Sequence, residues 1–202
     1  MPRTKEQFET MRNETREKIQ TAAMELFVQR GFGTTNVQEI ADKAGISIGL
    51  LYRHYKTKDE LFHELVKFAR TGLVRIIELF ESDESPAKLM NQFVHEVYQD
   101  MVSGEQLANL MILMSQSFSS RAGADDNQNE AAIINQKLLT ATSELIKRGQ
   151  KCEEFVSGNS YEMAMYFFAS IQGLAEMKVR LNNNFVMPST SILTMFLYGK
   201  GD

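Results

Sequence analysis

The sequence predicts an all-α protein, with an N-terminal three-helix helix-turn-helix domain followed by a larger helical domain. Apolar residues recur at helical spacing along most of the 202 residues. The chain has three prolines, and none lies between Ala87 and Met187, which leaves room for long helices. Residues 31–62 contain several closely spaced helix start and stop signals. We expect the two domains to occupy residues 1–58 and 59–202.

The N-terminal domain begins with a helix whose apolar face is Ile19, Ala22, Ala23, Leu26 and Phe27. Gly31 and Gly33 end this helix, and two overlapping capping frames, Thr35-x-x-Gln38 and Asn36-x-x-Glu39, start the next one. Gly45 can adopt the left-handed conformation of a sharp reversal. Ser47 caps a second short helix that runs to about His54, and Thr57-x-x-Glu60 caps a third. Two short helices joined in this way form a helix-turn-helix unit, whose second helix can lie in a DNA major groove.

The second short helix carries side chains that suit DNA. Arg53 can chelate guanine, Ser47 can bond to bases of either kind, and Ile48 and Leu50 can touch thymine methyl groups. Phosphate oxygens suit Tyr52 and the basic side chains, and Gly49 permits a close backbone approach. Our candidate DNA contacts are Thr35, Asn36, Ser47, Ile48, Gly49, Leu50, Tyr52, Arg53, His54 and Lys58. In the alternative interpretation Tyr52 and Tyr55 are half-buried core aromatics, and the basic residues form a solvated face.

Residues 12–65 resemble the DNA-binding domain of the TetR family of transcriptional regulators. The matching elements are Ile19-x-x-Ala22-Ala23-x-x-Leu26-Phe27, Gly31-Phe32, Thr35, Ile40-Ala41-x-x-Ala44-Gly45-Ile46-Ser47, Leu51-Tyr52-x-x-Tyr55 and Lys58-x-x-Leu61. The resemblance implies a homodimeric repressor that binds an inverted repeat of double-stranded DNA and is released by a small molecule. Many members have a polar or basic residue in place of Ile48 and a Thr in place of Leu50. Apolar residues at these positions favour thymine-methyl contacts or readout of DNA shape.

The rest of the chain reads as a series of helices. A long helix follows Lys58, and further helices begin near Pro86, Leu107, Ile134, Asn159 and Pro188, with a loop expected over residues 119–130. The helix after Asn159 is apolar nearly all round and therefore must be covered on both sides. We predict that the last two helices form a two-fold homodimer interface, as the family resemblance also implies. The alternative is that both helices belong entirely to the core.

The larger domain is a candidate for binding a small molecule. Twelve Met and thirteen Phe, with no Trp, give a soft and polarisable interior. The residues that we expect to line a cavity are Phe93, Met111, Met114, Phe118, Met163, Tyr166 and Phe167. Alternatively, these side chains simply fill the core. The family analogy suggests a hydrophobic or cationic ligand.

The distribution of charge and the number of cysteines indicate the cellular compartment of the protein and the kinds of partner that it can bind. Residues 1–60 carry 10 Lys and Arg against 9 Asp and Glu, whereas residues 61–202 carry 12 against 17. Phosphate contact therefore depends on local basic residues, such as those around Arg53, rather than on the net charge of −4. A single cysteine, Cys152, excludes an intramolecular disulfide and fits a reducing cytoplasm. With no signal-like apolar segment and no run long enough to span a bilayer, we expect a cytoplasmic protein without a membrane partner.

The sequence does not predict an enzyme. Its three histidines lack metal-site spacing, and the common nucleophile, phosphate-loop and dinucleotide motifs are absent. We therefore expect neither a metal site nor a cofactor. Two alternatives to the ligand-released regulator remain: a constitutive helix-turn-helix DNA-binding protein without a ligand, and a small all-helical adaptor or enzyme.

Overall fold

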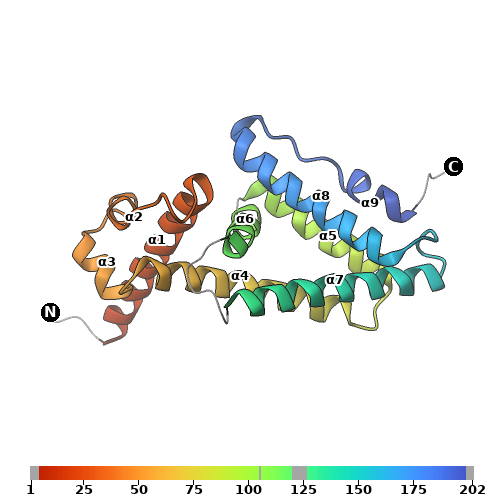
Figure 1. Cartoon of the computed structure of the whole chain (residues 1–202), viewed down its shortest axis with the longest axis horizontal. Coiled ribbons are helices and arrows are strands. Elements are labelled where there is room, and N and C mark those ends of the chain that lie inside the picture. Colours follow the sequence, from red (N-terminus) through yellow and green to blue (C-terminus); the bar gives the residue numbers. More distant parts are fainter. Residues whose placement is uncertain (1–4, 105, 120–126, 199–202) are drawn as a thin grey trace.

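A computed structural model of the chain describes residues 5–104, 106–119 and 127–198, and leaves out the side chains of residues 118–119 and 127–129. Within these residues all regular structure is helical, which confirms the predicted fold class. A small N-terminal unit lies at one end of the molecule (Figure 1). It contains α1 (Lys5–Arg30), α2 (Val37–Ala44) and α3 (Ile48–His54).

The remaining helices form a larger bundle. In chain order they are α4 (Lys58–Phe80), α5 (Pro86–Ser103), α6 (Gln106–Ser119), α7 (Asn127–Lys151), α8 (Ser160–Leu181), the short 3-10 turn η1 (Asn182–Asn184) and α9 (Thr190–Tyr198). Of the loop expected over residues 119–130, Ser119 ends α6 and residues 127–130 already belong to α7. Residues 120–126 lie outside the described part of the chain.

Local capping explains the reversal between α2 and α3. The side-chain oxygen of Asn36 accepts a hydrogen bond from the Glu39 amide at 2.9 Å, and the Glu39 carboxylate accepts one from the Asn36 amide at 3.2 Å. Of the two overlapping capping frames, the chain therefore uses the one that begins at Asn36. Gly45 follows with φ of 68°, and its amide donates to the carbonyl of Asp42 at 3.1 Å. A left-handed glycine closes α2, so that Ser47 can cap α3 after a turn of only two residues.

Two apolar cores share α4. The first core holds α1 to α3 against the start of α4, and its rings include Phe27 and Phe62, with centroids 5.5 Å apart. The second core lies in the bundle and begins at Ile77 and Phe80 near the end of α4. A single continuous helix therefore connects the two packed regions.

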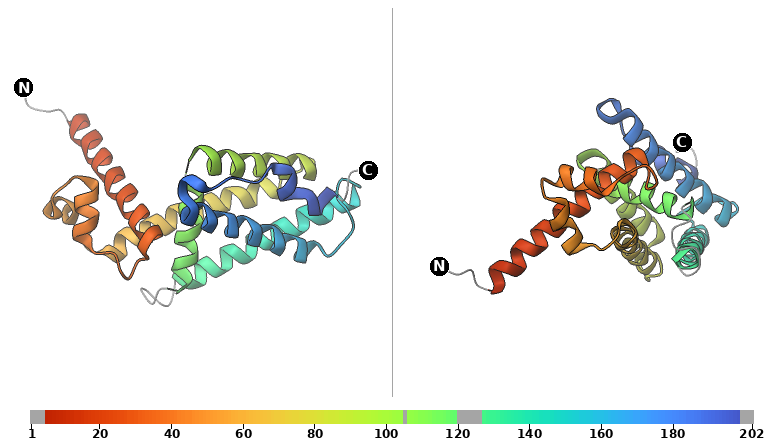
Figure 2. Two further views of the ribbon diagram at one scale, coloured as in Figure 1. Left: turned by 90° about the horizontal axis from the view of Figure 1, so that it is seen from above. Right: turned by 60° about the vertical axis from the view of Figure 1, so that its left-hand side comes forward.

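A second connection is made by α6, which lies between the N-terminal unit and the bundle (Figure 2). Leu113 and Met114 of α6 are buried in the first core. The side-chain amide of Gln116 also donates to the carbonyl of Phe27, near the end of α1, at 2.8 Å. The orientation of the N-terminal unit thus depends on α6 as well as on α4, and no local pattern in the sequence indicates the contact with α6.

Candidate nucleic-acid interface and apolar cavity

The helix α3 lies at one end of the molecule, far from α8 and α9 (Figure 1). Its single buried residue is Leu51, which packs in the first core. Ile48 and Tyr52 are 37% and 49% exposed, and Arg53 is also exposed. The exposed set also includes the predicted contacts Ser47 and Gly49, whereas Leu50 is half-buried at the edge of the helix. A side-chain row of this kind, free of intramolecular packing, can enter a groove of a nucleic acid.

Two of the predicted contact residues have structural roles instead. Thr35 is only 2% exposed, and its hydroxyl donates to the carbonyl of Gly31 at 2.9 Å. The Lys58 ammonium donates to the carbonyls of Phe32 and Thr35 at 2.7 and 2.6 Å. It also lies 4.4 Å from the Phe32 ring centroid. Because the ammonium is turned towards these groups, Lys58 fastens α4 to the α1–α2 turn rather than extending towards solvent. Asn36 is exposed, but its side chain is used as the cap of α2.

Tyr55 fixes the angle of α3 against α1 and α4. Its hydroxyl donates to the Glu64 carboxylate at 3.1 Å and accepts from the side-chain amide of Gln20 at 3.0 Å. Burial, with the nearby carboxylate of Glu64, raises the pKa of Tyr55 to about 12. The guanidinium of Arg16 pairs with the same carboxylate and lies 5.4 Å from the Tyr55 ring centroid. Tyr55 is thus a core residue, while Tyr52 is not, so the alternative interpretation holds for one tyrosine of the two.

The end of α3 lies in a basic environment. Burial lowers the pKa of His54, and the positive charges of Arg12 and Arg16 lower it further. Arg12 is exposed on α1 and Arg53 is exposed on α3. A phosphate placed here would be attracted to these cations and would also favour the protonated form of His54. In the sequence Arg12 is one of several basic residues of the N-terminal segment, and its position near His54 depends on how α1 packs.

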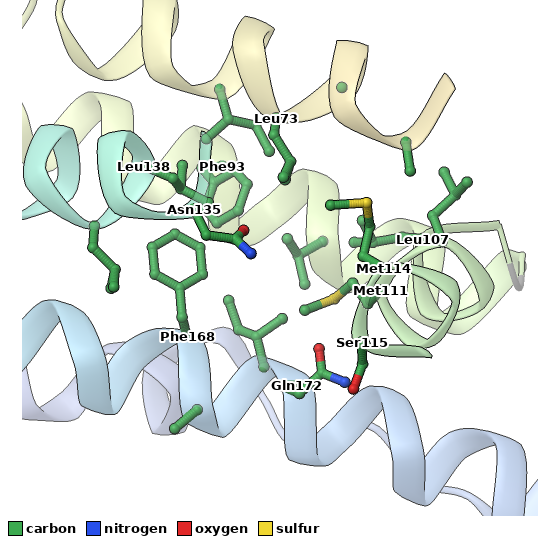
Figure 3. Close-up of a pocket in the computed structure, with 18 residues that line it drawn as sticks. Leu73, Phe93, Leu107, Met111, Met114, Ser115, Asn135, Leu138, Phe168 and Gln172 are labelled. Carbon is green, nitrogen blue, oxygen red and sulfur yellow. The ribbon is translucent and has the colours of Figure 1, made fainter. Parts of the chain in front are cut away.

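A cavity of about 460 Å³ lies between α4, α5, α6, α7 and α8 (Figure 3). Phe93, Met111 and Met114, three of the predicted ligand contacts, line it. The other lining residues are Ala69, Gly72, Leu73, Ile76, Val97, Leu107, Leu110, Ser115, Asn135, Leu138, Leu139, Phe168, Ala169, Ile171 and Gln172. A space of this size, with a mostly apolar wall and few polar groups, is typical of sites for small molecules.

The other predicted ligand residues lie elsewhere. Phe167 is fully buried in the core, with its ring centroid 5.9 Å from that of Phe93. Tyr166 is 61% exposed, and Met163 accepts a hydrogen bond from Gln150 outside the cavity. The side chain of Phe118 lies outside the described residues. The sequence reveals the apolar character of α8 but not the rotation of the helix, which turns Phe168 rather than Phe167 to the cavity.

Polar groups on the described part of the cavity wall are few and neutral. They are Ser115 of α6, Asn135 of α7 and Gln172 of α8. Figure 3 shows the amide of Asn135 pointing into the cavity from α7, whereas that of Gln172, on α8, lies at the wall with its nitrogen on the side of Ser115. The side-chain nitrogen of Gln172 is buried and has no hydrogen-bond partner in the described part of the chain. The wall therefore offers a donor that the protein itself does not satisfy.

An exposed apolar surface runs along α8 and α9. Met165, Tyr166 and Met177 of α8 and Ile192 and Met195 of α9 are each at least half exposed. The rings of Tyr166 and Phe196, 5.2 Å apart, bring the two helices together on this surface. The small residues Ala169 and Gly173 are also exposed on α8, and Ala169 lies at the boundary of this surface with the cavity, which it also lines. Ala175 is fully buried on the opposite side, so it does not share this surface.

The described residues contain no group of three or more His, Cys, Asp or Glu that could hold a metal ion. In the same residues, no helix combines the length and the apolar character that crossing a membrane requires.

Comparisons with known proteins agree with this geometry. Residues 19–65 match the family model described as "Bacterial regulatory proteins, tetR family". The HTH-type transcriptional regulator AcrR of Shigella flexneri is 29% identical over 100 residues, which are 48% of this chain and 46% of that protein. The chain thus spans about half the length of this relative.

Two further likenesses extend over most of the chain. The HTH-type transcriptional regulator TtgR of Pseudomonas putida is 25% identical over 178 residues, which cover 85% of this chain and 81% of that protein. The crystal structure of the MbdR regulator from Azoarcus sp. CIB superposes with a TM-score of 0.72 at 25% identity, and covers 93% of this chain and 100% of that one. These relatives are described as regulators and not as enzymes.

Proposed function

From the match of residues 19–65 to the tetR family model and the likeness to known regulators, we propose that the chain is a homodimeric transcriptional repressor of the TetR family that is released from DNA by a small molecule. The observation that carries this proposal is the separation of three surfaces on one chain. The exposed face of α3 lies at one end, the exposed apolar surface of α8 and α9 at the other, and the cavity between them. Residues 1–58 would bind DNA in the cytoplasm, and residues 59–202 would sense the ligand and dimerise.

The exposed residues of α3 suit recognition in the major groove. Arg53 can form a bidentate pair with guanine, and Ile48 can contact thymine methyl groups. Tyr52, His54 and Arg12 would contact phosphates. Sequence preference would therefore come from Arg53 and Ile48, and general affinity from the surrounding basic residues.

The apolar surface of α8 and α9 supports a two-fold dimer. Exposed methionines and the small residues Ala169 and Gly173 allow two copies of α8 to approach closely. A two-fold axis here would place two α3 helices on one side of the dimer. The operator would then be an inverted repeat, with half-sites roughly 34–36 Å apart or a multiple of this distance.

Ligand control is supported by residues that serve both regions. Met114 lines the cavity and is also buried in the first core, and Gln116, two residues further along α6, binds the carbonyl of Phe27. A ligand that shifts α6 would therefore tilt α1 and change the spacing of the two α3 helices. It acts only if it prefers the geometry that does not bind DNA. The presence of a cavity of ligand size favours this function over that of a constitutive DNA-binding protein.

Selection from pooled random DNA duplexes tests the proposed function. The purified protein should retain an inverted repeat, which sequencing of the bound fraction would identify. Arg53→Ala should lower affinity for that repeat by roughly tenfold or more, because a bidentate contact to guanine is lost. Arg75→Ala, which removes an equal charge from an exposed position of α4, should leave affinity nearly unchanged. If no sequence is enriched even at low salt, where phosphate contacts are strongest, the chain is not a DNA-binding regulator.

A further inference from the structure

The described residues of the cavity wall provide no counter-charge for an ionic ligand. Of the 18 described residues that line it, none is acidic or basic, and the polar ones are Ser115, Asn135 and Gln172. An ammonium or carboxylate group placed here would lose its hydration without gaining a charged partner. The cationic ligand suggested by family analogy therefore does not fit this wall.

The unsatisfied donor of Gln172 indicates what the ligand carries. A buried N–H without a partner is energetically costly, and proteins rarely retain one. A ligand oxygen with a lone pair, as in a ketone, an ester or an ether, would satisfy it on entering the cavity. Asn135 presents a second neutral amide from the facing helix α7, so a second polar atom on the ligand can also be bound.

We propose that the cavity binds an uncharged, mainly apolar molecule that offers a hydrogen-bond acceptor to Gln172. The inference rests on the proposed function, since it names the class of molecule that would release the repressor. The volume of about 460 Å³ accommodates a medium-sized molecule. Met111 and Met114 supply flexible apolar contacts to its body. The absence of a net charge and the presence of one hydrogen-bond acceptor, rather than a particular carbon skeleton, determine which ligands bind.

A matched set of ten-carbon probes tests each part of the proposal with the full-length protein. The probes are decan-2-one, 1-decene, decylammonium and decanoate, and calorimetric titration gives their affinities. Decan-2-one should bind at least about tenfold more tightly than either charged probe, because only the neutral molecule avoids an unpaired buried charge. It should also bind about fivefold more tightly than 1-decene, because one hydrogen bond contributes a net free energy that corresponds to about this ratio of affinities. Equal or tighter binding of a charged probe would overturn the proposal.

The variant Gln172→Leu isolates the donor. It should remove the advantage in affinity of decan-2-one over 1-decene. The affinity for 1-decene itself should stay unchanged, which would show that the protein is folded and the cavity intact. Gln136→Leu, at an exposed position of α7, is the matched control and should change neither affinity. If decan-2-one keeps its advantage in Gln172→Leu, Gln172 is not the anchor and the proposal fails.

The two proposals fail in different ways. If the duplex selection yields an operator but decan-2-one does not bind, the chain is a DNA-binding protein and the inferred ligand class is wrong. If decan-2-one binds and depends on Gln172, but no duplex is enriched, the ligand class stands and the repressor function fails.

Discussion

The N-terminal unit and the cavity-bearing bundle are packed in different ways. Around Phe62 the first core is filled by aromatic rings in tilted and edge-to-face contact, with centroid distances of 4.6 Å to Phe32 and 5.5 Å to Phe27. Polar side chains at its edge, such as Lys58 and Tyr55, have their hydrogen-bonding groups satisfied. In the bundle, by contrast, five helices surround an open space, and the side-chain nitrogen of Gln172 has no hydrogen-bond partner in the described part of the chain.

This difference matches what each region has to do. A helix that enters a DNA groove, as proposed for α3, must be held at a fixed angle. Dense packing and satisfied polar groups hold it there. A sensor must have two packings of similar free energy, which a void and an unsatisfied donor make accessible. We therefore expect substitutions in the first core to lower stability, and substitutions around α6 to change how the two regions are coupled.

The largest effect is expected from Phe62→Ala. The ring is buried and contacts two other rings, so its loss should lower the free energy of unfolding by about 3–5 kcal/mol. Urea unfolding followed by circular dichroism measures this. Phe68→Ala, six residues later on an exposed face of α4, should change stability by no more than about 0.5 kcal/mol. A comparable loss from both variants would contradict a densely packed first core.

Lys58→Ala separates a structural role from a DNA contact. The ammonium is bound by two carbonyls, so the variant should lose about 1.5–3 kcal/mol of stability, as for other hydrogen bonds of charged groups. The dependence of its DNA affinity on salt should match that of the unaltered protein, since no phosphate contact is removed. Lys56→Ala, at an exposed neighbouring position, should leave stability unchanged. If the DNA affinity of Lys58→Ala depends less on salt concentration than that of the unaltered protein, Lys58 does contact a phosphate.

Gln116→Leu tests the link between the two regions. The variant removes the hydrogen bond from α6 to the carbonyl of Phe27, which still accepts from the Gly31 amide at 2.8 Å, and it also removes a buried side-chain oxygen that has no partner in the described residues, so it should cost at most about 1 kcal/mol of stability. It should also reduce the effect of decan-2-one on DNA affinity, which a titration of labelled operator with and without the ketone measures. Full retention of that effect would show that α4 alone carries the signal.

The two regions also differ in how much of their structure can be predicted from the sequence. The helix-turn-helix is encoded by local signals, since Asn36, Gly45 and Ser47 act on backbone groups within a few residues. The apolar stripe of α4 is likewise readable from its spacing. The cavity is not local, because its wall collects residues of five helices whose rotations depend on mutual packing. This is why Phe168 and Gln172 could not be distinguished from Phe167 and Tyr166. The roles of Lys58 and Thr35 depend in the same way on the tertiary contacts of the α1–α2 turn.

The smallest expected effect concerns the pH dependence of α3. Burial, together with Arg12 and then Arg16, lowers the pKa of His54 in the folded protein, so the unfolded chain binds a proton more readily. Stability from the neutral imidazole is complete above the unfolded value of about 6.5 and is lost as the pH falls below it. DNA affinity should change in the opposite direction, because a nearby phosphate favours protonated His54. Urea unfolding and operator titration between about pH 7.5 and 5.5, on either side of the unfolded value, would measure both trends.

His54→Gln should flatten the two trends, whereas His95→Gln, at an exposed position of α5, should leave both as they are. Stability and DNA affinity should change in opposite directions as the pH falls. Their comparison therefore distinguishes an effect of His54 on the DNA-contacting surface of α3 from an effect on the core beneath it. If affinity and stability fall together with pH, the proton acts on folding alone. His54 would then belong to the packed unit and not to the surface that contacts phosphate.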